Sequence, residues 1–185
     1  MKPRRRARVA VLQTLYEIDT TSHDPQAAFE QRIAEDPLPE PAVQFARALT
    51  LGVVQQRATL DRVIEQIAPE WPLDQIAVVD RNILRMGVYE VLFGQATPLK
   101  VAINEAVELA KFFGSDASPR FVNGALDVGD GIRLRARGGE HDQHALLALR
   151  GGAGHLRDGD REESHRHAER RTGHAVSMRL PESGS

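Results

Sequence analysis

The clearest helical pattern in the chain is Val101-Ala102-Ile103-Asn104-Glu105-Ala106-Val107-Glu108-Leu109-Ala110-Lys111. Its apolar residues recur at spacings of three and four, whereas Asn104, Glu108 and Lys111 form a polar stripe at i, i+4 and i+7. This period matches the 3.6 residues of a helical turn and differs from the alternation of a half-buried strand. Gly114 follows where a helix stop is expected. The segment therefore predicts an amphipathic helix.

The same period recurs in most of the chain before residue 128. It predicts a first helix with Val9, Leu12 and Tyr16 on an apolar stripe and Arg6 on the opposite side. A short second helix is opened by Asp24-Pro25, an N-cap followed by a first-turn proline. A longer helix or helix pair follows from Pro41 to Ile67, and Gly52 within it indicates a close packing contact. The predicted helices follow one another along the chain, and no convincing strand is predicted between them.

Another helix is predicted from Asp80 to Phe93, with Asp80 placed to cap its start. A helical wheel puts Arg81, Asn82 and Arg85 on its polar face and Glu90 on its inward arc. A carboxylate on a buried arc must be paired, so a structural ion pair is favoured over a catalytic role for Glu90.

The segment from Ser118 to Leu126 is ambiguous, because its Asn123-Gly124 pair is also a strong hairpin-turn signal. No alternating strands flank it, so helix is preferred. The fold class expected for residues 1–127 is therefore all-α, as a single compact bundle of about six or seven helices.

Composition changes sharply near Asp127. Every Phe, Tyr, Trp, Asn and Lys precedes that point, whereas six of the seven His and ten of the 15 Gly follow it. A segment so poor in apolar residues cannot bury enough surface to offset its ordering entropy. Residues 128–185 are therefore predicted to be a disordered Gly/Arg/His-rich tail.

Several functional classes are disfavoured by composition. No apolar run is long enough for a membrane helix, and no secretory signal is present. The absence of Cys excludes disulfides and thiolate metal sites and is compatible with the cytoplasm. His23 is the one histidine before the tail and falls in a loop, so neither a catalytic residue, a metal site nor a cofactor site is expected.

Positive charge is concentrated at the N-terminus. The formal net charge is −2, yet five basic residues lie within the first eight positions: Lys2, Arg4, Arg5, Arg6 and Arg8. Cations are disfavoured at the positive end of a helix dipole, so another reason for them is needed. Arginine donates bidentate hydrogen bonds to phosphate and stacks on bases, which suits a nucleic-acid contact. A solvated basic tail explains the composition equally well.

Two aromatic residues also have alternative interpretations. Tyr16 could be a core residue or, if exposed, a partner contact, and Phe121 could be a core residue or a base-stacking platform. Periodicity alone favours the core for both.

Five motifs, taken in order and spacing, resemble the NusB family. The likeness covers residues 1 to about 127, and the Asn-Glu-Ala run and the later Phe-Val-Asn-Gly are specific to that family. The motifs are Met1-Lys2-Pro3-Arg4-Arg5-Arg6-Ala7-Arg8, Leu12-Gln13-Thr14-Leu15-Tyr16, Asp80-Arg81-Asn82-Ile83-Leu84-Arg85, Val101 to Lys111, and Phe121-Val122-Asn123-Gly124-Ala125-Leu126-Asp127.

The resemblance implies an all-helical, non-enzymatic transcription antitermination factor. Such proteins pair with the ribosomal protein NusE, bind the boxA element of nascent transcripts, including ribosomal RNA leaders, and act on the transcription elongation complex. It also implies that Tyr16 and Asp80 contact NusE, and that the five basic N-terminal residues contact RNA together with Lys111, Phe121 and Asn123. Lys111 and Phe121 would form the second half of one RNA surface.

An alternative function is that of a NusB-like accessory module that targets an RNA-modification system. A methyltransferase of that kind needs an α/β domain, which the tail cannot supply. The tail itself departs from the family and resembles GC-rich DNA translated out of frame. The sequence leaves the choice between monomer and homodimer open.

Overall fold

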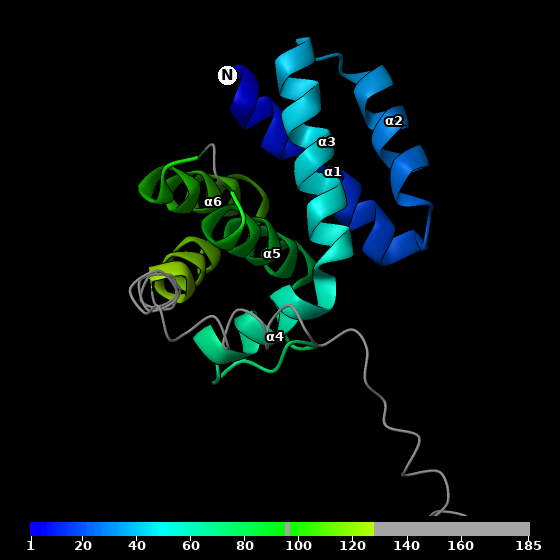
Figure 1. The fold of residues 1–185 in the computed structure, drawn as a ribbon. Coiled ribbons are helices and arrows are strands. Elements are labelled where there is room, and N and C mark those ends of the chain that lie inside the picture. Colours follow the sequence, from blue (N-terminus) through cyan, green and yellow to red (C-terminus); the bar gives the residue numbers. More distant parts are fainter. Residues whose placement is uncertain (95–96, 128–185) are drawn as a thin grey trace, which may run out of the picture. The chain divides into compact units, whose positions relative to one another are not determined.

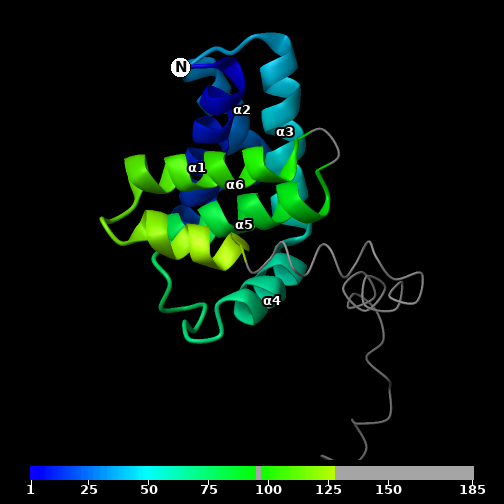
Figure 2. The ribbon, with the colours of Figure 1, turned by 90° about the vertical axis from the view of Figure 1, so that its left-hand side faces the viewer.

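The computed structural model describes residues 1–94 and 97–127, and these form helices joined by loops, with no strand among them. This result confirms the all-α prediction (Figures 1 and 2). The predicted disorder of residues 128–185 lies outside the described residues. The labelled helices are α1 (Pro3–Thr21), α2 (Pro25–Glu35), α3 (Glu40–Gln55), α4 (Arg57–Ile67), α5 (Val78–Leu92) and α6 (Leu99–Phe113), and residues 118–127 are also helical.

Local sequence accounts for several helix ends. Pro3 stands in the first turn of α1, and the Asp24 side chain accepts a hydrogen bond of 2.9 Å from the backbone N–H of Ala27, as its N-cap position predicts. The segment from Pro41 to Ile67 is a helix pair, because α3 and α4 are separated at Gln56. The Asn123-Gly124 pair lies within a helix, which confirms the preference for helix over hairpin.

Helix α5 differs from its sequence-based description at both its start and its exposed face. Its N-cap is Ala77 and Asp80 is the third residue of the helix, within the first turn, so the predicted cap is wrong. Asn82 and Arg85, expected on a polar face, are buried. The reason is tertiary: α5 packs against α1, α3, α4 and α6, and these neighbours leave it little solvent-facing surface.

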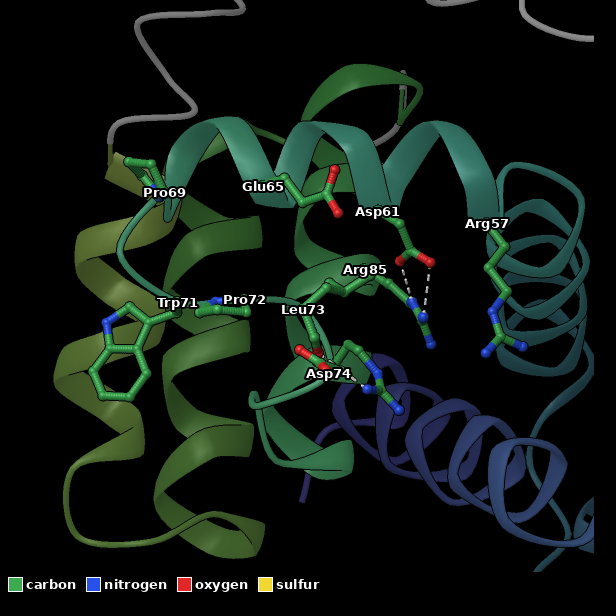
Figure 3. A pocket seen from close by; sticks show the side chains of 10 residues that line it. Arg57, Asp61, Glu65, Pro69, Trp71, Pro72, Leu73, Asp74 and Arg85 are labelled. Atoms are coloured by element: carbon green, nitrogen blue, oxygen red, sulfur yellow. Dashed lines mark hydrogen bonds and ion pairs between the residues drawn. The ribbon is translucent and has the colours of Figure 1, made fainter.

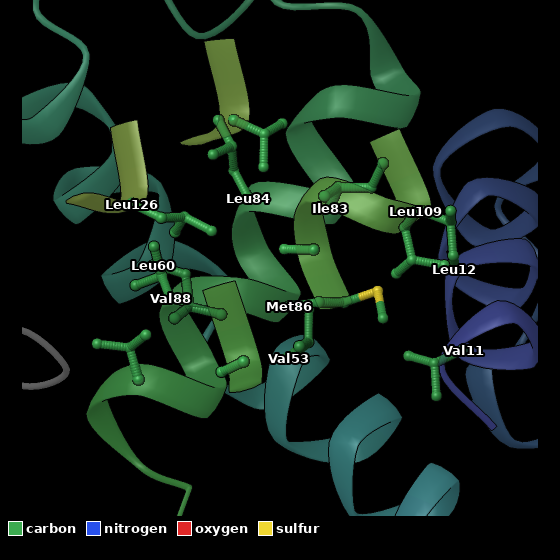
Figure 4. Close-up of a cluster of buried hydrophobic side chains, with 14 of the residues drawn as sticks. Val11, Leu12, Val53, Leu60, Ile83, Leu84, Met86, Val88, Leu109 and Leu126 are labelled. Carbon is green, nitrogen blue, oxygen red and sulfur yellow. The ribbon is translucent and has the colours of Figure 1, made fainter. Parts of the chain in front are cut away.

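The hydrophobic core surrounds α5 and draws on every labelled helix and on residues 118–127. In Figure 4, Val11 and Leu12 of α1 approach the α5 residue Met86 from one side, while Leu60 of α4 and Leu126 approach Val88 and Leu84 from another. Burying several large apolar side chains from elements distant in sequence supplies the main stabilising free energy of the bundle.

Gly52 allows α3 to approach α5 closely. A Cβ atom built at Gly52 would lie 2.1 Å from Cζ of Tyr89 and 2.2 Å from its hydroxyl oxygen, distances that real Cβ atoms do not show. The predicted packing contact at Gly52 is thus confirmed. Gly124 provides a contrast, since a Cβ there would meet no atom within 4 Å.

We expect Gly52→Ala to lower the free energy of unfolding by about 1–3 kcal/mol, because the Tyr89 ring must be displaced. Gly124→Ala is the matched control and should raise stability by about 0.5–1 kcal/mol, the usual gain for this change in a helix. Urea unfolding followed by circular dichroism measures both. Equal stability of the two variants would show that the space beside Tyr89 accommodates a side chain at position 52.

Candidate nucleic-acid interface

The N-terminal basic residues occupy the first two turns of α1, and their exposure falls along the helix. Lys2 and Arg4 are exposed, Arg5 and Arg6 are partly buried, and Arg8 is only 3% exposed. Arg4 and Arg8 lie on the same face of α1 and both reach Phe45, so their exposure differs because Arg8 lies one turn further along the helix, where α1 packs against α3 and α5. The five cations are therefore not equivalent.

Arg8 is a structural residue. Its Nε and Nη2 donate hydrogen bonds of 2.9 Å and 2.6 Å to the two carboxylate oxygens of Glu90 on α5, and both side chains are buried. The Arg8 guanidinium also lies 5.0 Å from the ring centre of Phe45 on α3. The expectation that Arg8 contacts RNA is therefore corrected, because its donors face inward. The expectation that Glu90 forms an ion pair is confirmed.

Arg5 and Lys111 are linked through acidic residues of α6. Arg5 makes a two-point contact with Glu105 at 2.9 Å and 3.0 Å, and its Nη1 lies 3.6 Å from Glu108. Glu108 also accepts a hydrogen bond of 2.7 Å from Lys111. The hydrogen bonds from Arg5 lower the pKa of Glu105, and the hydrogen bond from Lys111 lowers that of Glu108. Both carboxylates are thus held charged beside the cations.

Arg4 and Arg6 extend the basic surface toward α3 and the loop before it. The Arg4 guanidinium lies over the ring of Phe45, 5.0 Å from the ring centre, and Arg4 is exposed. Arg6 pairs with Asp36 and donates a further hydrogen bond of 3.0 Å to the carbonyl oxygen of Pro37. We call the surface formed by Lys2, Arg4, Arg5, Arg6 and Lys111 the basic face.

Phe121 and Asn123 do not join the basic face. They belong to the helix of residues 118–127, and in both ribbon views α6 lies between that helix and the start of α1 (Figures 1 and 2). Phe121 is partly buried and contacts Trp71 edge to face, with 5.7 Å between ring centres. The structure thus brings Lys111 to the arginines but leaves Phe121 and Asn123 in a separate region.

The two residues expected to bind a partner differ in exposure. Tyr16 is 45% exposed and borders a cavity of about 460 Å³ that Val79 and Phe113 also line, so periodicity placed it in the core incorrectly. Asp80 is only 8% exposed, and one carboxylate oxygen accepts a hydrogen bond of 2.7 Å from the Ser118 hydroxyl. Asp80 is therefore almost completely buried, and little of its side chain is accessible to a partner.

A second charged cluster lies at the middle of α5 and was missed by sequence reasoning. Buried Arg85 binds both carboxylate oxygens of Asp61 at 2.7 Å and 2.9 Å, and also binds Asp19 at 2.8 Å. Figure 3 shows the Asp61 contact in a cavity of about 510 Å³, with Arg57 at one end and Trp71 at the other. The acidic side chains of the cluster neutralise the buried Arg85 guanidinium, which would be costly to leave unpaired.

Neither a metal site nor a membrane span is found within the described ranges. Across residues 1–94 and 97–127, no three His, Cys, Asp or Glu side chains are grouped so that they could hold a metal ion. In the same ranges, none of the helices combines the length and apolarity needed to cross a bilayer.

Comparison with known proteins identifies the family. A sequence model of the NusB family matches residues 5–128, which is more than half of the chain. The chain belongs to the NusB family of transcription antitermination proteins. A similar relative is the transcription antitermination protein NusB of Chloroflexus aggregans, 46% identical over 125 residues that cover 66% of this chain and 83% of the relative.

Solved structures of the NusB family share the fold. NusB of T. maritima superposes with a TM-score of 0.66 at 35% identity, covering 70% of this chain and 92% of that structure. A chain from the crystal structure of the antitermination factors NusB and NusE in complex with dsRNA also gives a TM-score of 0.66, at 26% identity, covering 71% of this chain and 98% of the solved chain.

In this member of the NusB family, the pair between Arg8 and Glu90 should behave as a unit. We expect Arg8→Met or Glu90→Leu alone to cost about 3–5 kcal/mol, because each leaves a buried charge without its partner. The double variant should recover much of that loss. Chemical unfolding of all four proteins gives the coupling energy. If the double variant loses the sum of the two single losses in unfolding free energy, the two side chains do not stabilise the fold as a pair.

Proposed function

We propose that this chain is an RNA-binding transcription antitermination factor that, together with NusE, binds boxA-type sequences in nascent transcripts, including ribosomal RNA leaders, within the elongation complex. The observation that carries the proposal is the basic face, on which four N-terminal cations and Lys111 converge around the start of α1. Family membership and the similarity to a NusB chain solved with NusE and dsRNA support it. The proposal assigns the chain no catalytic step.

The proposed RNA contacts follow the exposure of the cations. Lys2, Arg4 and Lys111 are exposed, and Arg5, Arg6 and Lys111 would exchange part of their contact with carboxylates for contact with phosphates. Arg8 instead holds α1 in place through its buried contacts with Glu90 and Phe45. Phe121 and Asn123 are proposed as a second RNA contact, separate from the basic face.

Tyr16 is the proposed contact with NusE. Its exposed ring and the adjoining cavity, lined by Leu12, Val79 and Phe113, offer an apolar surface of the kind that protein interfaces bury. Asp80 follows Val79 in α5 but lines a different cavity, where it accepts a hydrogen bond from Ser118, so its proposed contribution to NusE binding is indirect. Residues 1–127 are the proposed RNA-binding domain, and no function is assigned to residues 128–185.

The direct test measures binding of labelled boxA-like RNA by fluorescence anisotropy, with and without NusE, over a range of salt concentrations. Each phosphate contact on a single strand contributes about −0.7 to the log–log salt slope. The variant Lys2→Ala/Arg4→Ala should therefore bind more weakly, with a slope flatter by about 1.4. Arg62→Ala/Lys100→Ala removes two exposed cations elsewhere and serves as the control. If wild type fails to bind with NusE present, the proposed function is wrong.

Glu108 should restrain RNA binding, because its carboxylate occupies Lys111 and attracts Arg5. We expect Glu108→Gln to increase RNA affinity by up to about fivefold, the range expected for losing an exposed ion pair. The control Glu65→Gln removes one exposed negative charge on α4 and should have a smaller effect. Unchanged or weaker binding by Glu108→Gln would exclude Glu108 as a competitor of phosphate.

A further inference from the structure

Trp71 is the one tryptophan of the chain, and it is 53% exposed in the connection between α4 and α5. Its position is fixed on both sides. Its backbone N–H donates a hydrogen bond of 3.0 Å to the carbonyl oxygen of Ala68, and prolines at positions 69 and 72 restrict the flanking backbone. A large apolar ring held at the surface in this way is available to a ligand.

The Trp71 ring belongs to a surface that includes Phe121. The two rings meet edge to face at an angle of 63°, an arrangement that leaves ring face uncovered. A cavity of about 340 Å³ beside them is also lined by Glu70, Arg120 and Gly124. Because Gly124 has no side chain and nothing stands within 4 Å of its Cβ direction, there is room for a planar group.

Both rings also line a second cavity of about 230 Å³, which reaches Asp80 and Ser118. One oxygen of the buried Asp80 carboxylate has no hydrogen-bond partner in the part of the chain that the structure describes. The aromatic pair thus stands between two cavities. The surroundings of the pair combine apolar area with a few polar groups, a composition that suits a nucleobase, which has flat faces for stacking and edges that form hydrogen bonds.

We propose that Trp71 and Phe121 together form a stacking platform for an unpaired base of the bound RNA. This proposal rests on the proposed function and deepens it, because it assigns a base contact to a residue outside the motifs that suggested RNA binding. Aromatic rings bind bases of any identity through their faces. The lining contains one basic and one acidic residue, Arg120 and Glu70, whose formal charges cancel, so stacking and not net charge would supply the affinity here.

The platform and the basic face can be distinguished by the salt dependence of binding, because the charges around the platform balance. We expect Trp71→Ala to weaken RNA binding about five- to 150-fold, the range for losing one stacked base. The loss should be equal at low and high salt, leaving the log–log slope unchanged, whereas Lys2→Ala/Arg4→Ala flattens it. Trp71→Phe keeps an aromatic face and should retain most of the affinity. Thermal unfolding of Trp71→Ala and Trp71→Phe shows whether either change disturbs the fold.

Trp71 provides its own spectroscopic signal. The experiment titrates boxA-like RNA into the full chain with NusE, follows tryptophan emission, and subtracts the same titration of Trp71→Phe to isolate Trp71. We expect RNA to quench this emission at the concentrations at which anisotropy reports binding. The measurement uses wild type, so it remains decisive even if Trp71→Ala does not fold.

Three outcomes would overturn the platform. Normal RNA binding by anisotropy with no change in Trp71 emission rejects it and leaves the proposed function intact. A loss of NusE binding by Trp71→Ala in the absence of RNA, with the fold retained, would instead assign the ring to the protein partner. Absence of RNA binding by wild type rejects the proposed function and the platform together.

Discussion

The buried charges of α5 constrain the rest of the bundle. Glu90 and Arg85 lie inside it, and neither can be left unpaired without a cost of several kcal/mol. Glu90 is paired by Arg8, whereas Arg85 is paired by Asp19 and Asp61. Arg8 and Asp19 both belong to α1, so a single helix supplies a partner to Glu90 and to Arg85. These two ion pairs fix how α1 lies against α5.

The same pairing orients the basic face. Once Arg8 is held between Glu90 and Phe45, the preceding turn of α1 must emerge beside α6 and α3. Arg5 then meets Glu105, and Arg4 meets the ring of Phe45. The positive charge available to a ligand is consequently smaller than the sequence count suggests, because carboxylates already neutralise part of it.

The two proposed RNA contacts differ in their physical basis. The basic face works through charge, and salt screens such contacts. The platform of Trp71 and Phe121 works through stacking, which is insensitive to salt and tolerant of base identity. Helix α6 separates the two regions (Figure 2), so an RNA touching both would have to extend across it. Charge would then govern encounter, and stacking would hold a base in place.

Sequence alone determined the helical fold class, the Asp24 cap, the close contact at Gly52 and the need for a partner at Glu90, because each depends on local spacing or on residue type. It also pointed to the N-terminal cations. Only the tertiary structure decided that Arg8 is internal, that Arg85 is buried, that Tyr16 is exposed and that Trp71 meets Phe121. A helical period gives the direction of a side chain around its own axis. It does not say which neighbours surround that helix, and those neighbours decide which charges are neutralised and which rings reach solvent.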